Sequence, residues 1–301
     1  MDLIHRFRDY LGRHSGRFHH RHQEDLLTSL LVMAWMVEAR DPYTGGHLWR
    51  VSQFSKLLAS DAGFAAADVS RVTVGGFLHD LGKISVPDQI LRKVDKLTFD
   101  EYEVIKTHPE IGWRMLAGHP LARIAEAAVR AHHERPDGHG YPRGLVGNAV
   151  PLDARVVGIC DAFDAMTSTR PYRRGMPITN ALSIIEENLD RQFDSALGAR
   201  FVNLGRAGQL DHIVGHSDEG IPLHVCDMCG PTLVLRRGQE VGSHVFCCNC
   251  GGEYQVVAER DCVQTVATGR VGSAAELEPE ADTDLIARQV QDLARTLLSA
   301  G

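Results

Sequence analysis

Apolar residues recur with a helical period over roughly the first two thirds of the chain. Between residues 25 and 205 they repeat mainly every three to four positions, and clusters of glycine, proline and aspartate interrupt the repeat. Apolar side chains also stand four, seven and eleven positions after His47, so this histidine shares the inward face of its helix. The pattern predicts an all-helical domain over 25–205, with His47 pointing into it.

The pattern changes in the last third of the chain. Residues 206–222 are rich in glycine and lose the helical period, which predicts a linker, and cysteine-rich sequence with β-forming residues follows over 223–266. Residues 267–301 are first acidic and then carry apolar residues at intervals of four, three and four, starting from Ile286. We therefore expect a small β domain, an acidic linker and an amphipathic C-terminal helix that docks on another surface.

Charge and hydropathy narrow the class of protein. The formal net charge of -7 argues against general attraction to nucleic acid. The longest apolar stretch, residues 26–37, is interrupted by Thr28 and Ser29 and is shorter than the ~20 residues that span a bilayer. The N-terminus has no secretory cleavage pattern, so we expect a cytoplasmic protein. Residues 1–24 form a basic segment to which we assign no function.

Six of the seven cysteines lie in the C-terminal part of the chain. Four of them form two Cys-x-x-Cys-Gly knuckles with 17 residues between them, a spacing typical of a zinc ribbon: Cys226, Cys229, Cys247 and Cys250. A domain of about forty residues buries little core, so we predict that one structural zinc supplies its folding energy. Because basic residues are few, we favour a structural or protein-docking role for the ribbon over nucleic-acid binding.

Histidines and carboxylates supply the candidate chemistry of the helical part. His79 and Asp80 end an apolar helix, and Lys83 follows on the same side. Further candidates in the same part are His47, His108, His132, His133 and Asp161. Five histidines and two carboxylates are hard to bury without metal, and a mixed imidazole and carboxylate set suits divalent iron or manganese. The number of ligands implies two ions, and Asp80 is the best candidate to bridge them.

Seven ordered motifs make residues 25–203 similar to an HD-GYP domain, a type of HD-superfamily metal-dependent phosphohydrolase. The motifs are RDPYTGGH at 40–47 with Arg50-Val51, LHDLGK at 78–83, KTHPEIG at 106–112, HHER at 132–135, DGHGYP at 137–142, DAFDAMT at 161–167 and RPYR at 170–173. Agreement at all seven sites is far more specific than any single motif.

The resemblance implies a role for each matching residue. The implied metal ligands are His47, His79, Asp80, His108, His132, His133 and Asp161. Lys83 would position or neutralise a phosphate beside the catalytic Asp80, and Asp164 would support the site from behind the ligands. Arg170 and Arg173 would grip phosphates through their forked donors, and Tyr141 would stack on the substrate or contact a partner. Tyr43 stands where some family members place a glutamate that helps hold a third ion, so we expect two.

The resemblance also implies a fold and a function. The implied fold is mainly α: an HD-type helical bundle, followed by a small β zinc ribbon and a C-terminal helix. The implied activity is a metal-dependent phosphodiesterase that hydrolyses a cyclic dinucleotide, first of all cyclic di-GMP to pGpG or GMP, by a metal-bridging hydroxide. The alternative is a non-catalytic cyclic dinucleotide receptor that signals through the ribbon or the C-terminal helix. A protein partner could bind the Gly-Tyr-Pro loop, the ribbon or that helix.

Overall fold

The structure, a computed structural model, describes residues 21–41, 45–93, 95–170, 173–259 and 262–297. Most of the basic N-terminal segment, and Tyr43, lie outside these residues. Within the described ranges, no helix combines the length and the apolar character needed to cross a bilayer.

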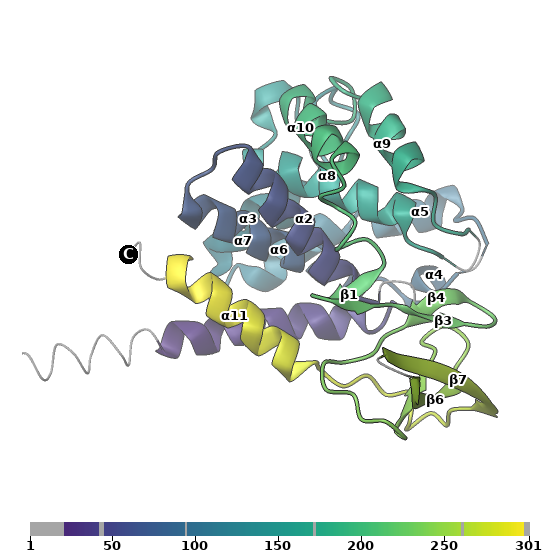
Figure 1. Cartoon of the computed structure of the whole chain (residues 1–301). Helices are drawn as coiled ribbons and strands as arrows, with labels where there is room; N and C mark the ends of the chain where they lie inside the picture. The colour runs from purple at the N-terminus through teal and green to yellow at the C-terminus, as the bar shows by residue number, and fades with distance from the viewer. Residues whose placement is uncertain (1–20, 42–44, 94, 171–172, 260–261, 298–301) are drawn as a thin grey trace, which may run out of the picture.

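The helical bundle forms the upper part of the molecule in Figure 1. Its helices are residues 21–38, α2 (His47–Asp61), α3 (Ala66–Leu78), α4 (Asp88–Leu91), α5 (Phe99–Ile105), α6 (His108–Leu116), α7 (Ala122–Ala131), α8 (Leu152–Thr167), α9 (Ile178–Glu187) and α10 (Ser195–Arg206), with 3-10 turns η1 (Leu81–Ser85) and η2 (Gly147–Ala149). Three fully buried rings, Phe54, Phe163 and Phe201, meet edge to face at 5.0 to 6.1 Å and join α2, α8 and α10. The mainly α fold predicted from the sequence is confirmed.

Two adjacent glycines let α3 lie close to its neighbours. A Cβ atom on Gly75 would lie 2.6 Å from the Cβ of Ala128 in α7, and one on Gly76 would lie 3.1 Å from the Cα of Ser52 in α2. Both distances are too short for ordinary side-chain packing. The small residues therefore bring the C-terminal end of α3, where His79 and Asp80 follow, against the helices that carry other candidate ligands.

The C-terminal part of the chain is built from short antiparallel strands. They are β1 (His216–Asp218) paired with β2 (Ile221–Pro222), β3 (His224–Cys226) paired with β4 (Gly230–Leu233), and a sheet of β5 (His244–Phe246), β6 (Gly252–Glu259) and β7 (Cys262–Val271). A small core of its own contains Leu233, Val245 and Val256. The last strand continues to Val271, five residues beyond the predicted end of the ribbon, because β7 pairs with β6 along its whole length.

Two segments outside the predicted domains pack against the bundle. Residues 206–222 do not behave as a linker, since Leu210 and Ile213 are buried in the bundle core and the β1–β2 hairpin follows them. The C-terminal helix α11 (Thr283–Leu297) buries its apolar stripe in the same core, and it crosses in front of the bundle in Figure 1. Gln289 of α11 contacts Gln53 of α2, and Thr296 contacts Ser70 of α3. The bundle is thus the surface on which the amphipathic helix docks.

Candidate metal centre

Six of the seven candidate ligands come from the ends of helices that meet at one place. His47 is the first residue of α2, His79 and Asp80 directly follow α3, and His108 is the first residue of α6. The other three are His132 and His133, which directly follow α7, and Asp161, which lies inside α8. Helix ends carry few intrahelical constraints on their side chains, and here they converge from across the bundle. Chain segments more than a hundred residues apart therefore form one site.

His47 and His79 form one half of the centre. Their Nε2 atoms lie 3.3 Å apart. The Nδ1 of His47 lies 2.8 Å from Asp164 Oδ2, and the Nδ1 of His79 lies 2.7 Å from the carbonyl oxygen of Gly76. A carboxylate and a carbonyl only accept hydrogen bonds, so each Nδ1 donates. In the neutral rings both Nε2 lone pairs then face the same space.

His108, His132 and His133 form the other half. The Nε2 atoms of His108 and His132 lie 3.2 Å apart. Their Nδ1 atoms lie 2.8 and 2.9 Å from the carbonyl oxygens of Ile105 and Ala128, which again fixes Nδ1 as the donor. One ring nitrogen from each of these three histidines lies within 4.8 Å of the others. The Nε2 lone pairs of His108 and His132 in the neutral rings therefore face the same space, as those of His47 and His79 do in the first half.

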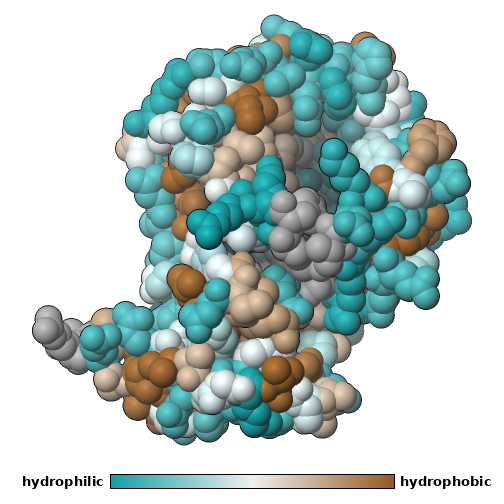
Figure 2. All heavy atoms as spheres, turned by 90° about the vertical axis from the view of Figure 1, so that its right-hand side faces the viewer, coloured by the Kyte–Doolittle hydropathy of each residue, from teal (hydrophilic) through white to brown (hydrophobic). Residues whose placement is uncertain are grey.

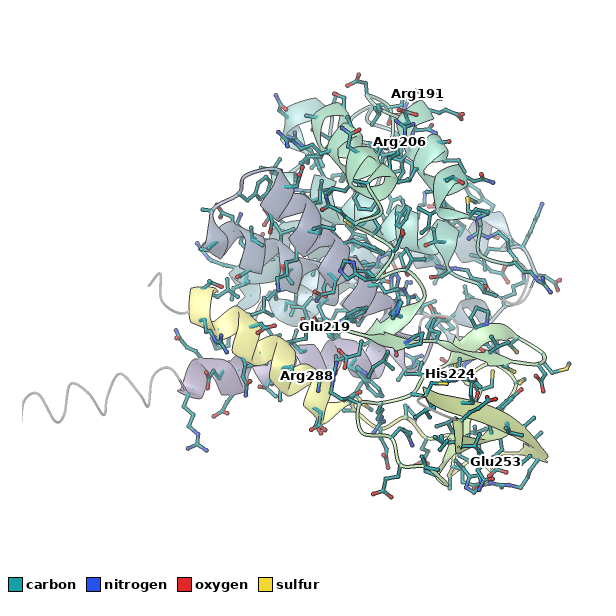
Figure 3. All side chains as sticks on the ribbon, in the orientation of Figure 1. Arg191, Arg206, Glu219, His224, Glu253 and Arg288 are labelled. Atoms are coloured by element: carbon teal, nitrogen blue, oxygen red, sulfur yellow. The ribbon has the colours of Figure 1, made fainter. Side chains whose placement is uncertain are left out.

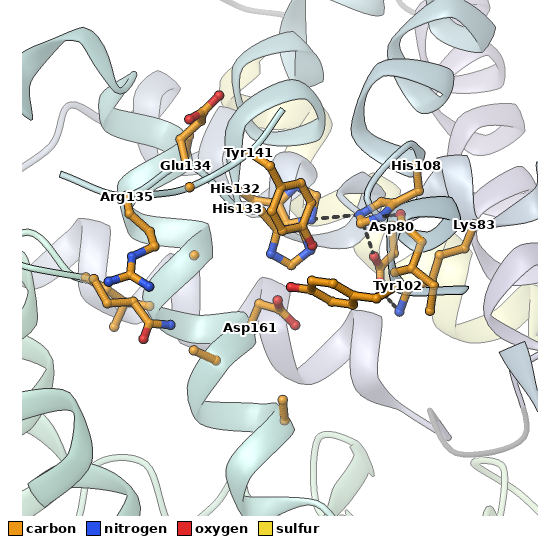
Figure 4. Close-up of a pocket in the computed structure, with 18 of the residues that line it drawn as sticks. Asp80, Lys83, Tyr102, His108, His132, His133, Glu134, Arg135, Tyr141 and Asp161 are labelled. Atoms are coloured by element: carbon orange, nitrogen blue, oxygen red, sulfur yellow. Dashed lines mark hydrogen bonds and ion pairs between the residues drawn. The ribbon is translucent and has the colours of Figure 1, made fainter. Parts of the chain in front are cut away.

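Asp80 lies between the two halves and presents a different oxygen to each. Its Oδ2 lies 3.6 Å from His47 Nε2 and 3.4 Å from His79 Nε2, and its Oδ1 lies 3.4 Å from His108 Nε2. Lys83 Nζ donates to Oδ2 at 2.7 Å. This is the geometry of a carboxylate that can bridge two ions. Figure 4 shows Asp80 between His108 and Lys83.

Asp161 approaches the first half from α8. Its Oδ1 lies 3.5 Å from His47 Nε2 and 3.7 Å from His79 Nε2. In the view of Figure 4 it lies below His133. All seven predicted ligands are therefore brought together.

The donor set fits two divalent cations. Two nitrogens bound at right angles to one ion, each at about 2.1 Å, lie about 3.0 Å apart, close to the 3.3 and 3.2 Å seen in the two halves. Pairs of imidazole lone pairs that face each other repel unless a cation or a proton lies between them. Orienting the rings through Nδ1 is also the usual support of metal-bound histidine. Imidazole and carboxylate together suit iron, manganese or a similar ion.

The two halves differ electrostatically. Burial opposes a charge on His79, but the carboxylates of Asp80 and Asp161 outweigh it and raise the pKa of His79 to about 10. Burial lowers the pKa of His108 to about 3 and that of His133 to about 4. Without metal, a proton is held in the His79 half, while the other half stays neutral. A metal ion entering the first half must displace that proton.

Arg50 belongs to the first of the seven motifs, and its contacts with the site were not predicted from the sequence. Its side chain is 1% exposed, and its guanidinium forms a fork on Asp164 with Nε at 2.6 Å and Nη2 at 3.0 Å. Nη1 donates to the carbonyl oxygens of Gly45 and His216. Asp164, fixed in this way, orients His47. A charged residue three positions after His47 on an inward helix face was the signal for this contact.

The metal centre forms part of the wall of a cavity of about 780 Å³. Its walls come from α4, α5, the Gly-Tyr-Pro loop and α8, and the wall residues include Lys83, Tyr102, Arg135, Tyr141 and Arg170. Tyr102 and Arg135 were not predicted. Figure 4 shows Arg135 at the opposite end of the site from Lys83 and His108. The volume is within the range typical of pockets for small ligands and cofactors.

The Gly-Tyr-Pro loop is fixed over the second half of the site. The Tyr141 ring stacks on His133 with centroids 4.6 Å apart and meets Tyr102 edge to face at 6.4 Å. A Cβ on Gly140 would lie 2.5 Å from the Cα of Glu134, so only glycine fits there. Both carboxylate oxygens of Glu134 accept backbone N–H groups from the far side of the loop. The ring of Tyr141 is therefore held next to the candidate metal ligands, on the wall of the cavity.

The two predicted phosphate arginines lie in different surroundings. Burial and the charge of Arg170 oppose the charge on Lys83, but Asp80 and Asp41 outweigh them and raise the pKa of Lys83. Arg170 thus adds positive charge on the cavity wall near the metal centre. Arg173 is not among the residues that line the cavity, and its guanidinium donates to the carbonyl oxygen of Ala165 near the end of α8. Its contact with a phosphate stays a prediction.

The four predicted zinc cysteines lie within 4.8 Å of one another. The Sγ atoms of Cys226 and Cys250 are 3.6 Å apart, near the roughly 3.8 Å expected for two thiolates on one tetrahedral zinc and far from the ~2.05 Å of a disulfide. Burial raises the pKa of Cys226, but a hydrogen bond from Tyr254 and backbone N–H groups outweigh it and lower that pKa to about 7. The cluster fits one zinc, with Cys247 and not Cys248 as its third member.

Both knuckle glycines adopt a positive φ, a conformation that glycine accepts more readily than other residues. Gly230 has φ 83° and Gly251 has φ 71°. The backbone N–H of Gly251 donates to the carbonyl oxygen of Cys247, which closes the second knuckle. On the face shown in Figure 2, hydrophobic side chains lie in separate small groups on both the upper and the lower part of the molecule. Met228, in the first knuckle, is 83% exposed.

Comparison with known proteins agrees with this geometry. The family model described as "HD domain" matches residues 31–197, more than half of the chain. The chain belongs to the HD domain family. This HD protein is 42% identical over 189 residues to the cyclic di-GMP phosphodiesterase response regulator RpfG of Xanthomonas campestris pv. campestris, a match that covers 62% of this chain and 50% of the relative. The resemblance to HD-GYP proteins predicted from the seven motifs is confirmed.

Two further relatives carry related names. A cyclic di-GMP phosphodiesterase of Thermotoga maritima is 34% identical over 196 residues, covering 64% of this chain and 53% of the relative. The 3'3'-cGAMP-specific phosphodiesterase 3 of Vibrio cholerae is 38% identical over 177 residues, covering 57% of this chain and 38% of the relative. The HD protein thus spans about half or less of the length of these curated relatives.

Proposed function

We propose that this HD protein is a metal-dependent phosphodiesterase that opens a cyclic dinucleotide, first of all cyclic di-GMP. The observation that carries the proposal is Asp80, which presents one oxygen to each of two converging histidine sets. Two divalent ions bound there, iron or manganese by donor type, would supply a bridging hydroxide and neutralise charge on the reacting phosphate. Relatives named for cyclic di-GMP and 3'3'-cGAMP support a cyclic dinucleotide substrate.

The side chains around the ligands suit an anionic substrate. Lys83 donates to Asp80 and keeps its positive charge next to the place where the phosphate would lie. Arg170 would hold a phosphate oxygen, and its forked donors suit that contact. Tyr141 and Tyr102 offer ring edges and faces to a nucleobase, and stacking of a base on an aromatic ring stabilises binding by about 1–3 kcal/mol. Asp164, which is 1% exposed, would keep the His47 ring in one orientation.

The ribbon cysteines would hold one structural zinc. Four thiolates leave no open coordination position, so we place no chemistry there. The thiolates are oriented by local donors, among them Tyr254 on Cys226.

The direct test is an assay of the full chain, loaded separately with manganese and with iron under anaerobic conditions. Cyclic di-GMP, 3'3'-cGAMP and cyclic di-AMP would each be incubated with the protein, and the products separated by chromatography. We expect metal-dependent conversion to a linear dinucleotide, or on to mononucleotides, with cyclic di-GMP converted fastest. Tight binding of the same compounds without turnover in any metal form would instead favour the receptor function, and a faster reaction of another dinucleotide would reassign the substrate.

A further inference from the structure

The β1–β2 hairpin belongs both to the bundle and to the ribbon. Leu210 and Ile213, just before β1, are buried in the bundle core. Ile221 in β2 instead packs against the ribbon core, which contains Cys226 and Cys247. The two strands are paired, with His216 opposite Pro222. A change in the fold of the ribbon therefore reaches β1 through backbone pairing.

One side chain joins this hairpin to the metal centre. Arg50 Nη1 donates to the carbonyl oxygen of His216 in β1 at 2.9 Å, while its Nε and Nη2 hold Asp164. Asp164 in turn accepts from His47 Nδ1. Two side chains, Arg50 and Asp164, thus connect β1 to His47, and both are almost fully buried. Buried and charge-assisted hydrogen bonds of this kind are strong and specific in direction.

The junction is tightly packed around this chain of contacts. A Cβ on Gly46 would lie 2.7 Å from the Cα of Ser217, so the N-terminus of α2 and β1 are almost in backbone contact. A Cβ on Gly45 would lie 2.8 Å from Val234, just after β4. The segment that leads into His47 therefore lies directly on the hairpin and on the ribbon.

Ion pairs also connect the hairpin to the ribbon and to α11. Asp218 is 5% exposed and pairs with Arg237 of the ribbon at 3.4 Å and with Arg288 of α11. Arg237 also donates to the carbonyl oxygen of Glu219. Figure 3 shows Arg288 on α11 beside Glu219, at the junction of the helix, the hairpin and the ribbon. The ribbon and α11 thus both hold Asp218, two residues after His216 in the hairpin.

We propose that the zinc ribbon is a positioning element for the His47 half of the metal centre. The folded ribbon holds the hairpin, the His216 carbonyl holds Arg50, and Arg50 holds Asp164 against His47. The other half is oriented differently, because the rings of His108 and His132 donate to backbone carbonyls within the bundle. Loss of zinc from the ribbon should therefore weaken one metal subsite and spare the other. This inference goes beyond the proposed function and holds whatever the substrate is.

The first test uses the full chain with Cys226→Ser and Cys229→Ser combined, and Cys248→Ser as the matched control in the other knuckle. Zinc and manganese per chain would be measured by atomic emission after equilibration at graded manganese concentrations. We expect the double variant to lose its zinc and to bind one manganese as tightly as the parent protein and the other 10–100-fold more weakly, as for loss of an outer support of a ligand. Cys248→Ser should keep all three ions.

Two outcomes would overturn the proposal. One is a double variant that loses zinc and binds both manganese ions with the affinity of the parent protein. The other is loss of both ions together with helical circular dichroism, which would mean that the ribbon only stabilises the bundle. Neither outcome depends on hydrolysis, so failure of this proposal and failure of the proposed function are distinguishable.

The second test asks whether the effect passes through Arg50. Arg50→Lys keeps a positive charge, but one ammonium group cannot reach Asp164, Gly45 and His216 together. Arg71→Lys is the matched control, because Arg71 forms a comparable fork on Asp153, also in α8, and touches no ligand. We expect Arg50→Lys to weaken one manganese subsite and Arg71→Lys to leave both unchanged.

A third variant that combines Arg50→Lys with the two cysteine substitutions completes a double-mutant cycle, which measures whether the two changes act independently. If the ribbon acts through Arg50, the combined loss of affinity will be no larger than the larger single loss. Losses that add in free energy would show two independent routes and overturn the proposed chain of contacts.

Discussion

The bundle and the ribbon each bring possible metal ligands together, but we expect their folds to depend on bound metal to very different degrees. In the bundle, ligands from five helices are set in a large apolar core that includes Phe54, Phe163 and Phe201. In the ribbon, Cys226 and Cys247 belong to a small core with few apolar members, Cys229 packs against that core, and Cys250 is exposed. We therefore expect the fold of the bundle to hold its metal site together, and the zinc to hold the fold of the ribbon together.

This difference follows from where the orienting hydrogen bonds come from. His79, His108 and His132 each donate to a backbone carbonyl of the helical bundle, so their rings are directed before an ion arrives. The ribbon strands β3, β4 and β5 have only three or four residues each, and the longest strand, β7, is almost entirely exposed. A chain of that size buries too little apolar surface to offset its conformational entropy without the metal. Four experiments would break or sharpen the comparison.

Metal removal should give the largest effect and should separate the two regions completely. Apparent binding free energies of structural zinc in small domains are about 10–16 kcal/mol, more than the ribbon core can replace. After treatment with a strong chelator, we expect the ribbon amide signals in nuclear magnetic resonance spectra to collapse to unfolded positions, while helical circular dichroism persists. Ribbon signals that stay dispersed in zinc-free protein would contradict the contrast.

Asp80→Asn should abolish turnover while leaving both regions folded. The amide keeps the size of the side chain, but it removes the charge and one of the two oxygens that face the histidine sets. We expect kcat to fall by roughly 10³-fold or more, as when groups that act as a unit are disrupted. Steady-state kinetics with measured metal content would check this. Asp153→Asn, in α8 but away from the ligands, is the control, and an Asp80→Asn protein with full activity would remove the basis of the account.

Arg170→Gln should act on the substrate and not on the metals. Its guanidinium is on the cavity wall and is assigned to phosphate, so a charge-assisted hydrogen bond worth about 1.5–3 kcal/mol would be lost. We expect KM to rise roughly 10–100-fold with unchanged metal content. Arg173→Gln should have a smaller effect, since that guanidinium is turned to the carbonyl of Ala165. Loss of metal from the Arg170 variant would refute the assignment.

Acid should weaken the two metal subsites unequally. His79 has a raised pKa of about 10, so at neutral pH a binding ion must displace its proton, whereas His108 and His133, with pKa values of about 3 and 4, are already neutral. Between pH 8 and pH 6, affinity in the His79 half should fall by up to about tenfold per unit, and affinity in the other half should stay nearly constant. Competition titrations with a metal indicator at several pH values would measure both. Parallel losses in the two halves would contradict this asymmetry.

Much of the candidate site could be predicted from the sequence, because most of its residues lie in short local motifs. His79, Asp80 and Lys83 fall on one side of a helix end by spacing alone, and the two cysteine knuckles have a spacing with few other uses. The link from Arg50 to Asp164 and His216 could not be predicted, since its partners are 114 and 166 residues away. Periodicity shows which way a side chain faces within its own helix and not which distant segment it meets.

The segment boundaries were missed for a related reason. Residues 206–222 are rich in glycine, which is typical of a linker, but Leu210 and Ile213 are nevertheless buried in the bundle. Burial of two apolar side chains in a short polar stretch leaves no period to detect. The amphipathic stripe of α11 predicted that the helix docks, and only the structure shows that α2 and α3 receive it.

The central claim is that Asp80 bridges two ions in the bundle, and anomalous X-ray diffraction from manganese-loaded crystals tests it most directly. Diffraction data collected near the manganese edge would locate each ion independently of any assumption about the ligands. We predict two manganese peaks ~3.5–4 Å apart, with Oδ2 of Asp80 bound to the ion held by His47 and His79, and Oδ1 bound to the ion held by His108, His132 and His133. A single peak, or two peaks to which Asp80 is not bound, would contradict the account.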